Sequence, residues 1–364
     1  MAHAGSDRGR VRGRTGLRRW AARGVAGVCL CAGALWLFGR WSFVIDVAVS
    51  QQVLIVAGCV LGVLVCVAMR CRRAAGACVL AVLVAGWPLA AGRTLRAPAV
   101  DLSSPPAPGL VRVVSFNIGP ENERWEVDLD RVLGWHADAV VLIEVPVELN
   151  RGVRRRGLLD GSGWSWEHRA WVDEITSPCL VLSRWPMEQV AVPGVAFAER
   201  DVLLVRLDVG SRVGGGPPGA GGGGGVGGVG GAVLVGLTHP HSPRTRARWA
   251  IGNETVARTV PGMVGAAESL GLPLAVGADL NAGPAGSRAR TARSAGLSMA
   301  KPLMGGWWGS FPSGWAGPLR VQLDDVWVTP GFEVVAWSSQ ASEGSDHRII
   351  IADLRPLALG QADR

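Results

Sequence analysis

The sequence contains no tyrosine and only one lysine, Lys301, although it is 364 residues long. Arginine therefore supplies nearly all of the positive charge, and the formal net charge is +8 at pH 7. Together with 52 glycines, this choice of residues is what a GC-rich genome produces. The basic balance is therefore weak evidence for a nucleic-acid partner.

Cysteine is scarce outside the N-terminal part of the chain. Six of the seven cysteines lie at or before Cys78, and Cys179 is alone in the remainder. One thiol cannot form an internal disulfide, and no Cys/His spacing is typical of a zinc site. The cysteines therefore predict no chemistry.

Charged residues are absent from three stretches, residues 24–39, 47–69 and 74–92. A helix needs roughly 20 apolar residues to cross a bilayer, and about 17 suffice, which the second and third stretches satisfy. The first reaches this length if the side chain of Arg40 snorkels to the interface and residues 41–45 extend the stretch. A cleaved signal peptide is the alternative for the first stretch, but two further apolar stretches favour a multi-span anchor with three transmembrane helices.

The distribution of arginine predicts the orientation of these spans. Residues 1–23, which we expect to be a disordered basic tail, contain seven arginines, and the 70–73 turn contains three. Only Arg40 lies between the first two spans. The positive-inside rule places the tail and the turn in the cytoplasm. Three crossings then put everything after Gly92 outside, in a multi-pass protein of the cell membrane.

The rest of the chain predicts one α/β domain. After a Pro- and Ser-rich linker at 93–109, short apolar runs alternate with polar or helical stretches over 110–356, and 357–364 form a tail. Residues 214–231 lack the Lys and Ser/Thr of a phosphate loop, so we expect a flexible glycine-rich insertion there. The expected strands are 111–116, 139–143, 179–182, 202–207, 233–237, 273–276, 326–329 and 349–352. The expected helices are 124–135, 246–260 and 287–295.

Polar residues stand at the ends of these apolar runs. Each one alone is explained by the preference of such residues for turns. As a set they indicate a site, because strand ends in layered α/β folds are where sites gather. Their carboxylate and amide oxygens suit a hard cation such as Mg²⁺. The set comprises Asn117, Glu144, His239, Asp279, Asn281, Asp324, Asp346 and His347.

The same residues carry a resemblance to a known family. Their segments resemble, in order, the motifs of the endonuclease/exonuclease/phosphatase family, from about Val111 to Leu354. A single Asp-x-Asn is weak evidence, whereas six segments in the right order are strong. The resemblance implies a four-layer α/β sandwich, with two β-sheets flanked by helices. The segments are Ser-Phe-Asn117, Asp138-Ala-Val-Val-Leu-Ile-Glu144, Thr-His239-Pro, Asp279-Leu-Asn281, Leu-Asp324-Asp-Val and Ser345-Asp346-His347.

The resemblance also implies a role for each matching residue. Glu144 would bind Mg²⁺, or Mn²⁺ as the alternative ion, with Asn117 beside it and Asp346 as a further candidate ligand. Asp279 would orient or deprotonate the attacking water, and Asn281 would hold the phosphate.

The two histidines would act on the phosphate. His239 would stabilise the transition state, and we favour it over His241 because it directly follows the strand. His347 would be a general base or a phosphate stabiliser, paired with Asp324 or Asp346. A neighbouring carboxylate fixes the tautomer of a histidine and raises its pKa.

Some positions depart from the family pattern or stay open. Asp325 adds negative charge where relatives often carry His or Arg, and only Asp-x-Asn is kept of the usual Gly-Asp-x-Asn. Asp173 and Glu174 are the nearest candidates for a second metal-binding carboxylate. A tryptophan cluster could be a substrate platform, a membrane contact or simple packing. This cluster consists of Trp307, Trp308 and Trp315.

These observations favour Mg²⁺-dependent hydrolysis of a phosphate mono- or diester at a membrane, most simply by a nuclease. A phospholipid or lipid-phosphate hydrolase is the alternative, because the anchor would hold the site near headgroups. A catalytically silent membrane scaffold with the same fold is the third candidate. The expected partners are therefore a nucleic acid or phospholipid substrate and the membrane, and no protein partner is predicted.

Overall fold

The computed structural model divides the chain into two compact units, a helical one over Met1–Ala91 and a mixed α/β one that begins at Gly92. It describes residues 7–91, 95–156, 165–169, 178–195, 202–210, 231–303 and 309–357. Several expectations fall outside these ranges: the glycine-rich insertion up to residue 230, Asp173 and Glu174, and the first two tryptophans of the cluster.

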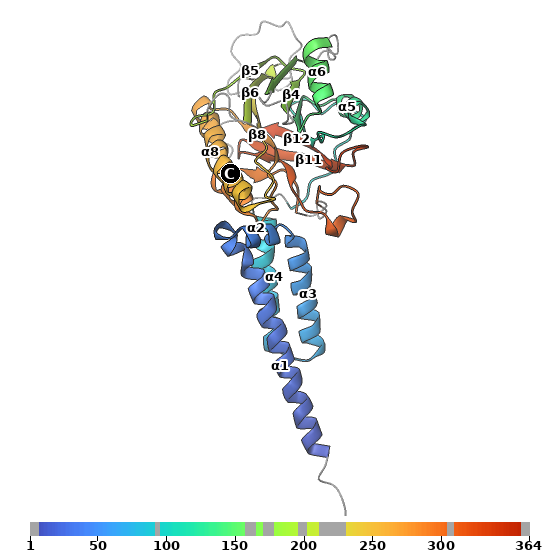
Figure 1. The fold of residues 1–364 in the computed structure, drawn as a ribbon, viewed down its shortest axis with the longest axis vertical. Coiled ribbons are helices and arrows are strands. Elements are labelled where there is room, and N and C mark those ends of the chain that lie inside the picture. The colour runs from blue at the N-terminus through green and yellow to red at the C-terminus, as the bar shows by residue number, and fades with distance from the viewer. Residues whose placement is uncertain are drawn as a thin grey trace, which may run out of the picture. The chain divides into compact units, whose positions relative to one another are not determined.

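Small side chains hold the helices of the first unit together. Helices α1, α3 and α4 pack side by side (Figure 1) around buried alanines and cysteines. A Cβ atom added to Gly33 would lie 2.8 Å from the carbonyl oxygen of Ala81, so α1 and α4 are in backbone contact there. Such close approach is typical of helices that associate in membranes. The elements are α1 (Asp7–Ala34), the 3₁₀ helix η1 (Leu35–Trp41), α2 (Phe43–Val49), α3 (Gln52–Ala68) and α4 (Arg72–Ala90).

Two helical segments of the described chain, Gly16–Trp41 and Arg72–Ala90, are long and apolar enough to cross a membrane. The second expected span is broken, because α2 and α3 meet at an angle of 72°. The two could form a third span only as a bent pair. The basic segment differs from the expected disordered tail, since α1 begins at Asp7. Arginine and alanine have high helix propensity, which favours extension of the apolar helix into this segment.

The second unit contains two six-stranded mixed sheets. In each sheet one central pair is parallel, β1 with β2 and β7 with β8, and the other neighbours are antiparallel. The first sheet has the order β11 (Phe332–Gln340), β12 (Ile349–Pro356), β1 (Val111–Asn117), β2 (Ala139–Ile143), β4 (Cys179–Ser183) and β3 (Ser165–Arg169). The second has the order β5 (Met187–Gln189), β6 (Val202–Asp208), β7 (Ala232–Thr238), β8 (Leu274–Asp279), β10 (Asp324–Val328) and β9 (Ser298–Met299).

The two sheets pack face to face, which buries the alternate residues of their strands. Val113 and Val141 of the first sheet share a core with Val235 and Ala275 of the second. At Gly277 the sheets nearly touch, since an added Cβ atom would lie 2.7 Å from that of Val141. Glycine is therefore required there.

Helices cover the two outer faces, on opposite sides of the paired sheets (Figure 1). Helix α5 (Trp125–Gly134) packs on the first sheet, and α8 (Arg246–Leu270) and α9 (Ser287–Ser294) pack on the second. The expected four-layer sandwich of two sheets between helices is thus confirmed. The remaining elements are α6 (Val147–Arg156) and the 3₁₀ helix η2 (Gly317–Leu319).

This topology gathers strand ends at one end of the sandwich. The carboxyl ends of β1 and β2 lie together because the strands are parallel, as do those of β7 and β8. Strand β10 runs antiparallel to β8, so its first residue, Asp324, pairs with the last residue of β8, Asp279. Strand β12 likewise begins beside the end of β1. Residues far apart in the sequence therefore meet at this end.

Candidate active site

A hydrogen bond between Asn117 and Asp279 joins the two sheets at this end. The amide Nδ2 of Asn117 donates to Oδ2 of Asp279 at 3.0 Å, and both side chains are buried. The other carboxylate oxygen of Asp279 accepts the backbone N–H of Asn281 at 2.8 Å. Asn281 in turn donates through Nδ2 to the carbonyl oxygen of Pro240, at 3.1 Å. The ends of β1, β7 and β8 are thus tied into one polar cluster.

Glu144 and His239 form the second contact of the cluster. Glu144 directly follows β2, and its Oε1 lies 3.2 Å from Nε2 of His239, which follows β7. The pair is an ion-pair contact and not a well-directed hydrogen bond, since Nε2 has no hydrogen-bond partner within the described chain. The same Nε2 lies 3.9 Å from Oδ2 of Asp279. Glu144 has a φ of +53°, a left-handed conformation that costs a non-glycine residue free energy.

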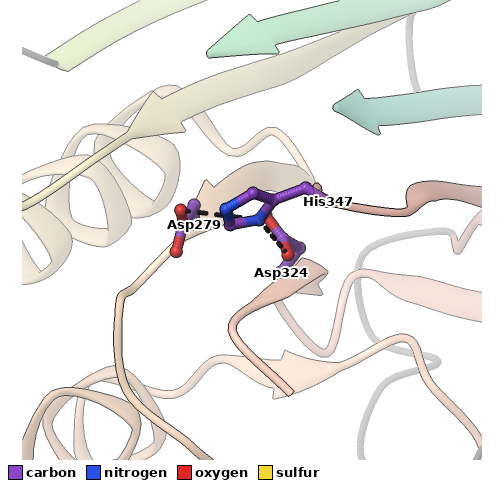
Figure 2. Close-up of side chains that lie close together, drawn as sticks. All are labelled: Asp279, Asp324 and His347. Carbon is purple, nitrogen blue, oxygen red and sulfur yellow. Dashed lines mark hydrogen bonds and ion pairs between the residues drawn. The ribbon is translucent and has the colours of Figure 1, made fainter. Parts of the chain in front are cut away.

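His347 lies between two aspartates. Its Nδ1 is 2.8 Å from Oδ2 of Asp324 and 3.9 Å from Oδ2 of Asp279. Figure 2 shows the imidazole ring of His347 between these two carboxylates. The short contact supports Asp324, of the two expected partners, as the residue that orients the ring.

Four residues that the sequence analysis did not single out hold His347 and Asp324 in place. The hydroxyl of Ser310 accepts the backbone N–H of Asp324 at 3.0 Å, and the ring of Phe311 lies 4.7 Å from that of His347. On α5, the buried Asp128 accepts the N–H groups of Glu343 and Gly344, at 2.7 and 3.2 Å, and also the side chain of Asn122, at 3.1 Å.

Ser345, which the sequence analysis quoted only as part of a motif, completes this support. Its hydroxyl donates to the carbonyl oxygen of Asn117 at 2.7 Å and accepts the N–H of His347 at 3.0 Å. The segment before β12 is therefore attached to the end of β1. No local pattern in the sequence marks the contact with Asn117, because this partner lies 228 positions away along the chain.

Asp346 lies at the exposed edge of the cluster, and Asp325 contacts residues outside it. The side chain of Asp346 is 66% exposed, and its Oδ1 is 3.8 Å from Nε2 of His347. Asp325 is buried on the opposite face of β10, where its carboxylate accepts the side-chain N–H groups of Gln322 and Trp337 at 3.0 and 3.2 Å. Its carboxylate is therefore held by Gln322 and Trp337 rather than by the residues around His347.

Asp138, which opens the second motif, lies at the far end of β2 from Glu144. It accepts the backbone N–H of Arg112 at 2.9 Å and the indole N–H of Trp185 at 3.1 Å. These contacts fasten strands to one another, so its role is structural.

The electrostatics of the site favour charged histidines. Burial lowers the pKa of His347, but the charge of Asp324 and its hydrogen bond outweigh burial and raise that pKa to about 10. Burial likewise opposes the charged form of His239, yet contacts with Cys179, Glu144 and Asp279 raise its pKa well above 6.5. Both imidazoles are therefore cationic near neutral pH.

The pKa values of the two carboxylates that contact these histidines, Glu144 and Asp324, shift in opposite directions. For Glu144, burial raises the pKa, but the close contact with His239 and the charge of that ring outweigh burial, so the pKa is lowered. For Asp324, burial is the larger effect and its pKa is raised. Glu144 is thus an anion in a partly exposed position, which suits a ligand of a cation.

The donors present fit a hard divalent cation. Glu144, Asn117 and Asp279 supply oxygen atoms, the ligand type that Mg²⁺ prefers. The buried Oδ1 of Asp324 has no hydrogen-bond partner within the described chain. Asp279, Asp324 and His347 also each offer one ligand atom within 4.8 Å of the others. The site thus contains more oxygen acceptors than hydrogen-bond donors, and a bound cation would satisfy the acceptors that remain.

Comparison with known proteins adds a family match. A sequence model of the Endonuclease/Exonuclease/phosphatase family matches residues 114–347. A comparison with curated protein sequences finds no match.

Similar solved structures each cover about two thirds of this chain. The catalytic domain of human Nocturnin is 16% identical over 68% of this chain and 95% of its own, with a TM-score of 0.48. An endonuclease/exonuclease/phosphatase from Bacteroides vulgatus is 17% identical to this chain. The match covers 68% of this chain and 99% of the other, with a TM-score of 0.49. TDP2 of D. rerio, complexed with single-strand DNA product, is 13% identical to this chain. The match covers 67% of this chain and 98% of the other, with a TM-score of 0.45. All three TM-scores lie below 0.5.

Proposed function

The chain belongs to the endonuclease/exonuclease/phosphatase family, and on that premise we propose that its second unit is a Mg²⁺-dependent hydrolase of phosphate mono- or diesters, with a nucleic acid as the favoured substrate. The observation that carries the proposal is the cluster formed at one end of both sheets. There an anionic Glu144, a buried Asp279 and two cationic histidines lie within about 4 Å of their neighbours.

Glu144 and Asn117 would hold the metal ion, whose charge would neutralise the developing charge on the phosphate oxygens. We leave Asp346 out of this ligand set because its side chain is 66% exposed. Asp279 would orient the attacking water and accept its proton, and it is positioned for this by its bonds from Asn117 and Asn281.

The histidines would donate hydrogen bonds to the phosphate. A donor aimed at the charge that develops in the transition state stabilises that state more than the ground state. The raised pKa values of His239 and His347 favour this role, and for His347 they favour it over general base. Asp324 would hold the ring of His347 through Nδ1, which leaves Nε2 for the substrate.

We also propose that the helical unit anchors the chain in the cell membrane with the catalytic unit outside. The two membrane-length apolar helices and the ten arginines of the tail and the 70–73 turn support this arrangement. An anchored enzyme would meet lipid headgroups, so a phospholipid or lipid phosphate is the second candidate substrate.

The test is hydrolysis by the purified full-length chain in detergent micelles. We would offer single-stranded DNA, RNA and phospholipid separately, with Mg²⁺ and with EDTA, and measure released nucleotide or phosphate. Glu144→Gln should abolish Mg²⁺-dependent release. The matched control is Glu333→Gln, because Glu333 is half exposed and pairs with Arg355 at the far end of its strand.

Metal-dependent release of nucleotide would support the nuclease, and release from lipid would favour the second candidate. Absence of any metal-dependent release, with the unfolding transition intact, would leave the silent membrane scaffold as the better account.

A further inference from the structure

Four thiols lie buried inside the helical unit, apart from the candidate active site. Cys29 comes from α1, Cys59 and Cys66 from α3, and Cys78 from α4. An added Cβ atom on Gly62 would lie 2.5 Å from Sγ of Cys29 and 3.4 Å from Sγ of Cys78, so this glycine makes room for both sulfur atoms. Spacing along the chain does not predict this cluster, because packing of three helices creates it.

Cys66 and Cys78 are one pair in the cluster whose sulfur atoms are in contact. Their Sγ atoms are 3.9 Å apart, and both residues are fully buried. They lie near the turn that joins α3 to α4, on helices that pack against each other. A disulfide has an S–S length of about 2.05 Å, so the two atoms need to approach by roughly 2 Å for a bond to form.

We propose that Cys66 and Cys78 are a redox-modifiable dithiol that closes to a disulfide between α3 and α4. Reactivity, rather than packing, usually decides why a buried cysteine is kept. The choice of Cys66 rests on its sulfur–sulfur contact with Cys78, although its Sγ also lies 3.7 Å from the backbone oxygen of Ala22.

A disulfide fits this pair better than a metal ion does. Within the described residues, one group of three side chains places its ligand atoms within 4.8 Å of one another, and it consists of Asp279, Asp324 and His347. Three of the thiols are therefore not close enough together to bind one metal ion. Two thiolates around a monovalent soft cation would leave a net negative charge among apolar side chains, which is costly. The disulfide leaves no charge.

The reaction balances with a quinone as the oxidant. The S–H bonds of Cys66 and Cys78 break and one S–S bond forms, which releases two electrons and two protons. The quinone takes up both and becomes a quinol. A reducing dithiol reverses the change by exchange through a mixed disulfide.

The sequence offers a direct assay for this link. Arg70, Arg72 and Arg73 lie between the two cysteines, so trypsin separates them unless a disulfide joins the fragments. The full-length chain in detergent would be treated with tetramethyl-benzoquinone, whose fully substituted ring cannot add a thiol. Free thiols would then be alkylated and the digest analysed by mass spectrometry without reductant.

We expect residues 41–70 joined to residues 74–93, and separation of the two after reduction. The joined species should fall at least ten-fold in Cys66→Ser and in Cys78→Ser. It should persist in Cys59→Ser, which changes the other thiol of the first fragment, and in Cys31→Ser, which changes an exposed thiol. Alkylated, unjoined fragments from the oxidised wild-type chain would overturn the proposal. So would a joined species that survives Cys66→Ser.

Discussion

The side chain of Asn117 at the end of β1 donates a 3.0 Å hydrogen bond to Asp279 at the end of β8, and these strands belong to different sheets. The bond fixes the position of the proposed base relative to the proposed metal ligands. Because both groups are buried, removal of either would leave an unsatisfied partner, at a cost of about 1–3 kcal/mol.

The pair of His347 and Asp324 predicts a pH dependence. The pKa of His347 is raised from 6.5 to about 10, so the charged pair stabilises the fold fully below about pH 6.5 and loses this contribution as pH rises through about 10. If the imidazolium serves as a donor, activity should persist to about pH 10. In Asp324→Asn the alkaline limb should move toward 6.5. Rates measured from pH 6 to 11 would show it, and an unchanged limb in the variant would contradict the assigned cause.

The backbone at Glu144 gives a prediction about stability. Its φ of +53° is left-handed, where a Cβ atom costs roughly 1–2 kcal/mol and glycine costs nothing comparable. Glu144→Gly should therefore be more stable than Glu144→Ala by about 1 kcal/mol, although both should be inactive. Thermal unfolding of the full-length chain would measure the difference.

The control for this comparison is the exposed Glu148 in the first turn of α6. There glycine should be less stable than alanine, because glycine is a poor helix former. The same order of stability at both positions would mean that the conformation of Glu144 is not left-handed.

The buried strands could be predicted from the sequence with little error. Runs such as Ala139–Ile143 consist of β-branched and aliphatic residues that end at polar ones, and this pattern marks a buried strand directly. All eight expected strands are present with small shifts at their ends. Strands β3, β5, β9 and β11 were not expected. Strand β11 is the longest of these, and its pattern was missed because it alternates buried and exposed residues irregularly and contains a bulge near Val334. Helix α8 was expected to end at residue 260, but it continues past Pro261 to Leu270.

The candidate site could be predicted only in part, for a physical reason. Polar residues at strand ends are visible in the sequence, so Asn117, Glu144 and Asp279 could be named. Their pairing depends on which strands become neighbours, and that depends on the register of β10 against β8. For this reason Asp346 could not be separated from Asp324 as the partner of His347.

The orientation of the chain remains a prediction. Arginine lies on the tail and in the 70–73 turn, which the positive-inside rule places in the cytoplasm. Alkaline phosphatase fused after Gly92 should therefore be active, and a cytoplasmic reporter at the same position should be silent. A fusion within the 70–73 turn is the control and should give the reverse result. An active cytoplasmic reporter after Gly92 would show that the number of crossings is even.

Catalysis should depend on Asp279, His239 and His347 together. The Oδ2 atom of Asp279 lies 3.9 Å from a ring nitrogen of each histidine, so one phosphate can meet all three groups. Removal of one donor aimed at developing charge commonly costs about 10²–10³ in rate. We therefore expect Asp279→Asn, His239→Ala and His347→Ala each to lower kcat by at least about 10².

Because these groups act on one phosphate, the combined loss in the triple variant should be smaller than the product of the three single losses. Steady-state rates of the four variants beside Glu333→Gln would measure this, with thermal unfolding to confirm that each variant folds. Losses that multiply would mean that the three residues act independently. Near-wild-type turnover in all the single variants would show that the cluster formed by the two sheets is not where the chemistry occurs.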